Sequence, residues 1–163
     1  MLHRLFIILL FSSCTTVTAV ENSNRPNRAS SSNISSDQEA LRRTANNLIG
    51  SPYRYGGTNP SGFDCSGFTS YVYQNTLNIP LNRSSESQSR MGKTVNLRNL
   101  QVGDLVFFKL KPNGKINHVA MVVDGSNGQM IVVHSTSSKG VIKQDIYASN
   151  YWKSKIVQAK RIL

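Results

Sequence analysis

Cysteine is scarce in this 163-residue chain, because the sequence contains only Cys14 and Cys65. Cys65 is therefore the only cysteine beyond the first fourteen residues, and it has no partner for an internal disulfide. Histidine is nearly as rare, with only His118 and His134 after His3. No C-x-x-C or H-E-x-x-H pair, no phosphate-binding glycine motif and no G-x-S-x-G elbow occurs. These absences argue against a structural zinc site, a nucleotide site and a serine hydrolase.

Acidic residues are also few, since 8 Asp and Glu stand against 19 Lys and Arg. Such a charge favours contact with polyanions or acidic surfaces. Nucleic acid is not the expected partner, because the basic residues are scattered without a recognition-helix pattern. A carboxylate-rich cell wall or anionic lipid headgroups fit better, and a solvated basic surface without a partner is the alternative.

Long apolar runs are absent as well. A basic start, the apolar run Leu5–Phe11 and two small residues after it have the three parts of a secretory signal. The run is shorter than the about 20 residues that a membrane-spanning helix needs. Cleavage before Cys14, which would then be acylated as in a lipoprotein, is favoured over cleavage after Ala19. We therefore expect residues 1–19 to be a signal peptide, with a lipid anchor on Cys14.

One folded domain is expected after the signal. Residues 20–36 are rich in Ser and Asn and poor in apolar residues, which predicts a flexible tether. Residues 37–163 suit one domain of ordinary size. Helical periodicity comes first in this domain, and short apolar runs separated by turns come after it. This order predicts an α+β fold, with N-terminal helices packed on a central antiparallel sheet.

The boundaries of these elements follow from caps and periodicity. The expected helices are Ser36 or Asp37 to Ile49, Cys65 to about Gln74 behind an Asp64 N-cap, and a short one within Arg83–Met91. The expected strands are Asp104–Phe108, Val119–Val123, Met130–Val133, Val141–Lys143 and Ile156–Ala159.

The unpaired Cys65 is the main candidate for chemistry. Compartments outside the cytoplasm favour disulfides, so an exported chain that keeps one free thiol needs a reason for it. The first turn of a helix, behind Asp64, is a position that lowers the pKa of a thiol and makes it a better nucleophile. The alternative is a buried thiol that only fills space in the core.

Strand pairing can bring the two histidines together. If Asp124–Gly128 is a hairpin loop centred on Ser126, His118 stands directly opposite His134, with Cβ atoms about 5 Å apart. Their even separation puts both on one face of the sheet. One imidazole could accept the thiol proton while the other orients it, and the spacing does not decide which is the base. Zinc held by Cys65 and both histidines is the alternative.

Five motifs follow one another along the domain. They are Tyr53–Gly57, Phe63–Phe68, Val102–Phe108, His118–Ala120 and Val133–Ser135. In residue type and order they resemble the NlpC family of bacterial cell-wall cysteine endopeptidases. The segments Met91–Lys93 and Tyr151–Arg161 are similar to its Spr-type murein endopeptidase lipoproteins in particular.

The resemblance implies a papain-like α+β domain that hydrolyses peptide bonds in peptidoglycan, next to meso-diaminopimelate, without a cofactor. It implies that Cys65 is the nucleophile, His118 the general base and His134 the residue that orients it. Tyr53 would help to bind the oxyanion together with the backbone N–H of Cys65. The remaining two site residues, Asp64 and Ser66, would line the substrate groove.

Three departures from the family pattern accompany these matches. Pro80–Arg83 stands where the family usually has Leu-Pro-Arg, so no role is assigned to Arg83. Ala120 replaces the usual glycine, and the loop between the histidines is longer by an even number of residues, which preserves their shared face.

The resemblance favours the D-alanyl to diaminopimelate cross-link as the bond cleaved, with the γ-D-glutamyl to diaminopimelate bond as the alternative. A protein that binds peptidoglycan without cleaving it is the hypothesis from another class. We expect a monomer on the periplasmic side of the envelope of a Gram-negative bacterium, anchored to a membrane by its lipid.

Overall fold

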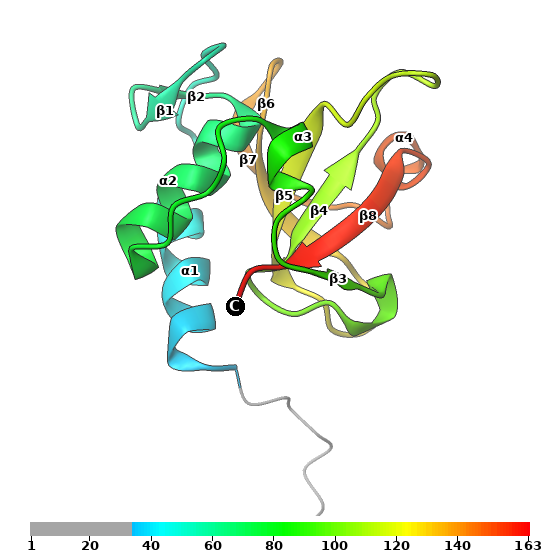
Figure 1. Cartoon of the computed structure of the whole chain (residues 1–163), viewed down its shortest axis with the longest axis horizontal. Coiled ribbons are helices and arrows are strands. Elements are labelled where there is room, and N and C mark those ends of the chain that lie inside the picture. The colour runs from blue at the N-terminus through cyan, green and yellow to red at the C-terminus, as the bar shows by residue number, and fades with distance from the viewer. Residues whose placement is uncertain (1–33) are drawn as a thin grey trace, which may run out of the picture. The chain divides into compact units, whose positions relative to one another are not determined.

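The computed structural model describes residues 34–163 (Figure 1). The expected signal peptide, the acylation of Cys14 and nearly all of the expected tether lie outside these residues. Helices come first in the described segment and a six-stranded antiparallel sheet follows, which confirms the predicted α+β class.

Residues 34–163 form two long helices and three single helical turns. They are α1 (Ser36–Asn47), α2 (Cys65–Leu77), α3 (Ser85–Gln88), the 3-10 turn η1 (Leu97–Asn99) and α4 (Asn150–Lys153). The main sheet has the order β3-β8-β4-β5-β6-β7. Its strands are β3 (Lys93–Val95), β4 (Leu105–Phe108), β5 (His118–Asp124), β6 (Ile131–Thr136), β7 (Gly140–Asp145) and β8 (Ile156–Arg161). A separate hairpin joins β1 (Thr58–Asn59) to β2 (Gly62–Phe63).

Side-chain caps begin both long helices, and a left-handed residue ends α2. Ser35, rather than Ser36 or Asp37, caps α1, because its side chain accepts a hydrogen bond from the backbone N–H of Gln38 and the Gln38 side chain bonds back. Asp64 caps α2 as predicted. This helix continues beyond the expected end near Gln74, because Asn78 adopts the left-handed conformation (φ 56°) that closes it only after Leu77.

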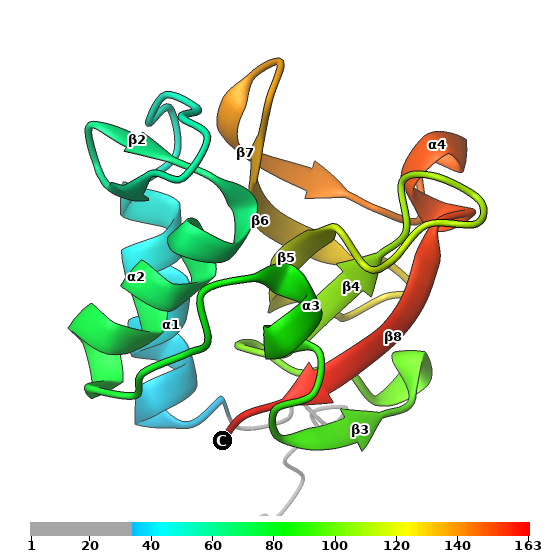
Figure 2. The same cartoon turned by 45° about the horizontal axis from the view of Figure 1, so that its top comes forward.

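An apolar cluster covers each face of the sheet. Figures 1 and 2 show α1 and α2 side by side against one face, with α4 beyond β8 at the other side. Odd-numbered residues of β4 and β5, such as Phe107 and Met121, pack against the helices. Even-numbered residues, such as Phe108 and Val122, pack on the opposite face, which Trp152 of α4 helps to cover. His118 and His134 therefore belong to the second face by strand alternation.

The register of the β5–β6 hairpin differs from the prediction. Val122 pairs with Val132, whereas the predicted loop would have paired it with Met130. The observed pairing is offset by two residues from the predicted one, and a one-residue irregularity follows between Val122 and Asp124. The two histidines are therefore diagonal neighbours and not directly opposite. A shift of two residues keeps both on one face, so the predicted shared face is confirmed although the pairing is wrong.

Short elements escaped the sequence analysis. β3 forms the sheet edge beside β8, α4 follows β7, and the β1–β2 hairpin precedes the cysteine helix. Each has too few residues to show a period. Among residues 34–163, no helix has the length and apolar character needed to cross a membrane.

Candidate active site

Cys65 occupies the first position of α2, directly after β2 and its Asp64 cap. Backbone N–H groups at this end of a helix have no partner within the helix, so that of Cys65 is available to a ligand. The backbone N–H of Val119 in β5 also lies beside the sulfur and stabilises its thiolate. The start of α2 therefore meets the sheet one residue from His118.

A network of hydrogen bonds around Asp64 holds the first turn of α2 in place. Its carboxylate accepts hydrogen bonds from the backbone N–H of Gly67 (2.7 Å) and from both terminal nitrogens of Arg83 (3.0 and 2.6 Å). Burial would raise the pKa of Asp64, but the hydrogen bonds from Arg83 and Gly67 lower it overall. A Cβ atom on Gly67 would lie 2.0 Å from the carbonyl oxygen of Gly57. Only glycine therefore lets α2 approach the preceding loop so closely.

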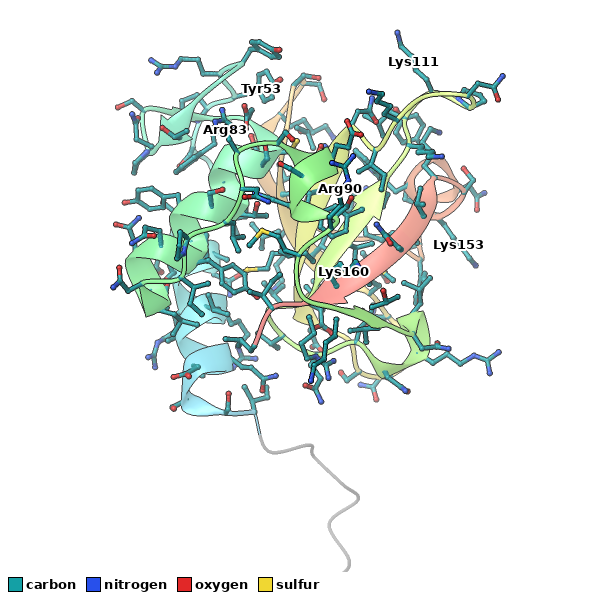
Figure 3. All side chains as sticks on the ribbon, in the orientation of Figure 1. Tyr53, Arg83, Arg90, Lys111, Lys153 and Lys160 are labelled. Atoms are coloured by element: carbon teal, nitrogen blue, oxygen red, sulfur yellow. The ribbon has the colours of Figure 1, made fainter. Side chains whose placement is uncertain are left out.

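Gln88 of α3 holds the segment that carries Arg83. Its buried amide donates to the carbonyl oxygens of Ser66 (3.0 Å) and Asn82 (2.8 Å) and accepts from the hydroxyl of Thr69 (2.9 Å). These bonds connect α2 to the residue before Arg83. Figure 3 accordingly shows Arg83 and Tyr53 at the same end of the molecule, where α2 begins.

The two histidines form a hydrogen-bonded chain with Gln144. Nε2 of His118 lies 2.9 Å from Nδ1 of His134, and Nε2 of His134 lies 3.3 Å from Oε1 of Gln144. Because Oε1 of Gln144 can only accept, it fixes the proton of His134 on Nε2. Nδ1 of His134 then accepts the Nε2–H of His118. Nδ1 of His118 is left with a free lone pair, which is what a general base for Cys65 needs.

Both imidazoles are neutral at physiological pH. Burial lowers the pKa of His118 to about 3, and the neighbouring His134 contributes to the shift. Burial also lowers the pKa of His134 to about 4, against the opposing hydrogen bond with Gln144. Burial raises the pKa of the Cys65 thiol, and the charge of Asp64 adds to this effect. The predicted lowering of the thiol pKa is therefore wrong for the free protein, because burial outweighs the helix terminus.

These buried histidines should make folding stability depend on pH. Between about pH 4 and the unfolded value of about 6.5, the unfolded chain binds protons that the folded protein does not. The free energy of unfolding should therefore fall on acidification through this window, by up to about 1.4 kcal/mol per pH unit for each histidine. Urea denaturation at pH 7, 6 and 5 measures it. The double variant His118→Gln/His134→Gln should have a shallower dependence, and an equal slope in both proteins would contradict this explanation.

Tyr53 lies near the thiol and lines the same groove. Burial raises the pKa of its hydroxyl, and interactions with Cys65, Asp64 and Tyr55 raise it further. The hydroxyl therefore stays protonated and can donate a hydrogen bond. With the free N–H of Cys65, it provides two donors for an oxyanion that forms next to the sulfur.

Replacement of Tyr53 by Phe should lower kcat by about 10²-fold and leave the Tm nearly unchanged, because the ring remains and only the hydroxyl is lost. Tyr55→Phe is the matched control, since Tyr55 is 90% exposed and does not line the groove. Steady-state kinetics and thermal melts of both variants test the prediction. An equal loss in both variants, or a change in KM alone, would count against a role for Tyr53 at the oxyanion.

The groove over Cys65 has a volume of about 400 Å³. Cys65, His118, Tyr53 and the chain of residues from Ser135 to Lys139 line it, together with Leu110, Asn117, Ile142, Gln144, Tyr151 and Trp152. Asp64 and Ser66 are not among the lining residues, so their predicted contact with substrate remains a prediction. Within residues 34–163, no cluster of three or more His, Cys, Asp or Glu side chains could hold a metal ion.

Residues 50–161 match the NlpC/P60 family over more than half of the chain. The chain belongs to the NlpC/P60 family. It is therefore a cysteine-type hydrolase, as the sequence motifs predicted.

Relatives and solved structures support this membership. The murein DD-endopeptidase MepS/murein LD-carboxypeptidase of Escherichia coli K12 is 32% identical over 174 aligned positions, which cover 96% of this chain and 88% of that protein. The gamma-DL-glutamyl hydrolase of Bacillus subtilis is 41% identical over 127 positions, covering 76% of this chain and only 30% of that protein. The crystal structure of an NlpC/P60 family protein from Bacillus cereus superposes with a TM-score of 0.68 at 34% identity, covering 77% of this chain and 40% of that one.

Sequence reasoning missed several residues that build this NlpC/P60 site. Gln144 extends the histidine chain, and Trp152 packs against both imidazoles, with ring centroids 4.8 Å from His118 and 4.9 Å from His134. Arg83 was left without a role because its surrounding motif departs from the family pattern. The position of Gln144 was open to prediction. It lies two residues from Ile142 and so on the same face of β7, and Ile142 is the cross-strand partner of His134.

Proposed function

We propose that this NlpC/P60 protein is a peptidoglycan endopeptidase that works by a Cys-His-His mechanism. The observation that carries the proposal is the chain of hydrogen bonds from Gln144 through His134 to His118, which leaves one basic nitrogen in a groove shared with the only cysteine of the described residues. A protein that only binds peptidoglycan would have no need for a basic nitrogen in the same groove as a thiol.

The proposed reaction begins when Nδ1 of His118 takes the thiol proton of Cys65 as the sulfur attacks the scissile carbonyl carbon. The carbonyl oxygen gains the negative charge, which the backbone N–H of Cys65 and the hydroxyl of Tyr53 stabilise. His134 accepts the Nε2–H bond of His118 and so stabilises the imidazolium that forms.

Collapse of this intermediate breaks the peptide bond, and His118 gives its proton to the leaving amine. The acyl group then remains on Cys65 as a thioester. Water attacks the thioester with His118 as the base, which releases the carboxylic acid and regenerates the thiol. The concerted proton transfer suits a thiol and an imidazole that are both neutral in the free protein.

The proposed substrate bond is the D-alanyl to diaminopimelate cross-link. The support is the similarity over nearly the whole chain to a protein named as a murein DD-endopeptidase. The γ-D-glutamyl to diaminopimelate bond is the second candidate, because a relative with 41% identity is named as a gamma-DL-glutamyl hydrolase. We further propose export, a lipid on Cys14 and action on the periplasmic side as a monomer.

Digestion of purified cross-linked muropeptides, with products identified by mass, tests the function and names the bond. Cleavage of the cross-link converts a dimer into two monomers with intact stems. Cleavage after D-glutamate instead releases a disaccharide dipeptide. If neither product forms, the proposed endopeptidase function fails.

A further inference from the structure

The turn between β6 and β7 forms one rim of the groove over Cys65. Ser137, Ser138 and Lys139 connect the paired residues Thr136 and Gly140. Figure 2 shows the β6–β7 hairpin rising at the end of the molecule that also holds β2 and the start of α2. This turn therefore lies where a bound stem peptide would pass.

The turn is held rigidly although its side chains are exposed. The Thr136 hydroxyl donates to the carbonyl oxygen of Gly140 (3.2 Å), and Gly140 takes the positive φ (66°) that closes a three-residue loop. The backbone N–H of Val141 donates to the carbonyl oxygen of Ser51 (2.9 Å), which ties the strand to the loop before Tyr53. A ligand would therefore meet a pre-ordered loop and would lose little entropy in ordering it.

The three side chains of this turn have no hydrogen-bond partner in the part of the chain that the structure describes. The hydroxyls of Ser135 and Thr136 are both used, by Phe63 and Gly140. By contrast, no bond engages the side chains of Ser137, Ser138 or Lys139 among residues 34–163. All three can donate hydrogen bonds, and the ammonium of lysine can only donate.

Lys139 also sets the charge of the groove. Among the described residues that line it, none carries a carboxylate, and Lys139 is the only charged side chain because the imidazole of His118 is neutral. Arg83 nearby is already paired with Asp64 through two hydrogen bonds. An unpaired cation beside free hydroxyls, in a groove without acids, favours an anionic acceptor.

We propose that Ser137, Ser138 and Lys139 form a subsite that binds a carboxylate of the stem peptide next to the scissile bond. This inference rests on the proposed function for the identity of the peptide. A stem peptide offers such carboxylates on D-glutamate and diaminopimelate. The subsite makes Lys139 the residue that distinguishes a free carboxylate from its carboxamide.

Binding to the Cys65→Ala protein tests the subsite without the need for cleavage. Isothermal titration would compare a stem peptide that carries both the D-Ala–diaminopimelate cross-link and the γ-D-Glu–diaminopimelate linkage with the same peptide in which the carboxylates beside these two bonds are carboxamides. On this background, Lys139→Gln should weaken binding of the carboxylate peptide about tenfold and that of the carboxamide less than twofold. Lys139→Arg should retain most of the affinity, and added salt should reduce the difference between the peptides.

Lys111→Gln is the matched control, since Lys111 is exposed on the β4–β5 loop at the same end of the molecule and does not line the groove (Figure 3). Equal weakening of both peptides by Lys139→Gln, the same effect from Lys111→Gln, or no binding of the carboxylate peptide at all would overturn the inference. If the peptides bind with the expected discrimination while the unmodified protein releases no muropeptide products, the proposed function fails and the subsite stands.

Discussion

Replacement of Cys65 by Ala is expected to lower muropeptide cleavage by at least about 10⁴-fold and to shift the Tm by less than about 3 °C. The rate falls because no other thiol exists among the described residues to form the thioester. Stability is kept because the side chain is only partly buried and belongs to the margin of the core, where the loss of one sulfur atom leaves little cavity. Initial rates from chromatography and a thermal melt measure the two effects.

Two further variants sharpen this prediction. Cys65→Ser keeps the shape of the side chain but should be nearly as inactive as Cys65→Ala, because an imidazole with a lowered pKa is too weak a base for an alcohol. The Lys111→Gln protein is the control for purification and assay conditions, and it should cleave muropeptides at the rate of the unmodified protein. Full cleavage by the Cys65→Ala protein would remove the thiol from the mechanism.

The histidine chain predicts a ranked series of losses. His118→Gln removes the base and should lower kcat by about 10³- to 10⁴-fold. His134→Leu leaves the Nε2–H of His118 without an acceptor and should cost about 10²-fold, since the orientation of the base is lost. His134→Gln provides an amide oxygen that can still accept this bond, so it should cost less than His134→Leu.

The readout for this series is the division between kcat and KM. The losses should fall on kcat, because the imidazoles act on the reacting bond and not on the rest of the peptide. Equal activity of His118→Gln and His134→Gln would contradict the two roles that the hydrogen-bond chain assigns to these histidines. An increase in KM alone, with kcat unchanged, would instead assign the pair a role in substrate binding.

Local signals made the nucleophile and the shared face of the histidines predictable. Asp64 before a helical period gives the cap of α2, and strand alternation depends only on whether a separation is even. The exact pairing of the hairpin was not predictable in the same way. The observed register is offset by two residues from the predicted one beside a one-residue bulge near Asp124, and no side-chain pattern distinguishes one even register from the next.

The supporting residues could not be read from the sequence, because their partners are distant along the chain. Arg83 reaches back 19 positions to Asp64, and Gln88 reaches 22 positions to the carbonyl oxygen of Ser66. Trp152 meets the imidazoles only after the chain has completed β7. Packing of this kind depends on the assembled fold and leaves no periodic signal. The same applies to the pKa of Cys65, since its burial outweighs the position on the helix.

The nitrogen-15 spectrum of the two imidazoles tests the proposed activation of Cys65 most directly. With protons on Nε2 of both His118 and His134, each ring should show the neutral Nε2–H tautomer at pH 7. Because burial lowers both pKa values to about 3 and about 4, these signals should persist on acidification to about pH 5. The Nδ1–H tautomer in His118, or a doubly protonated ring at pH 7, would leave no lone pair on Nδ1 for the thiol proton and would contradict the mechanism.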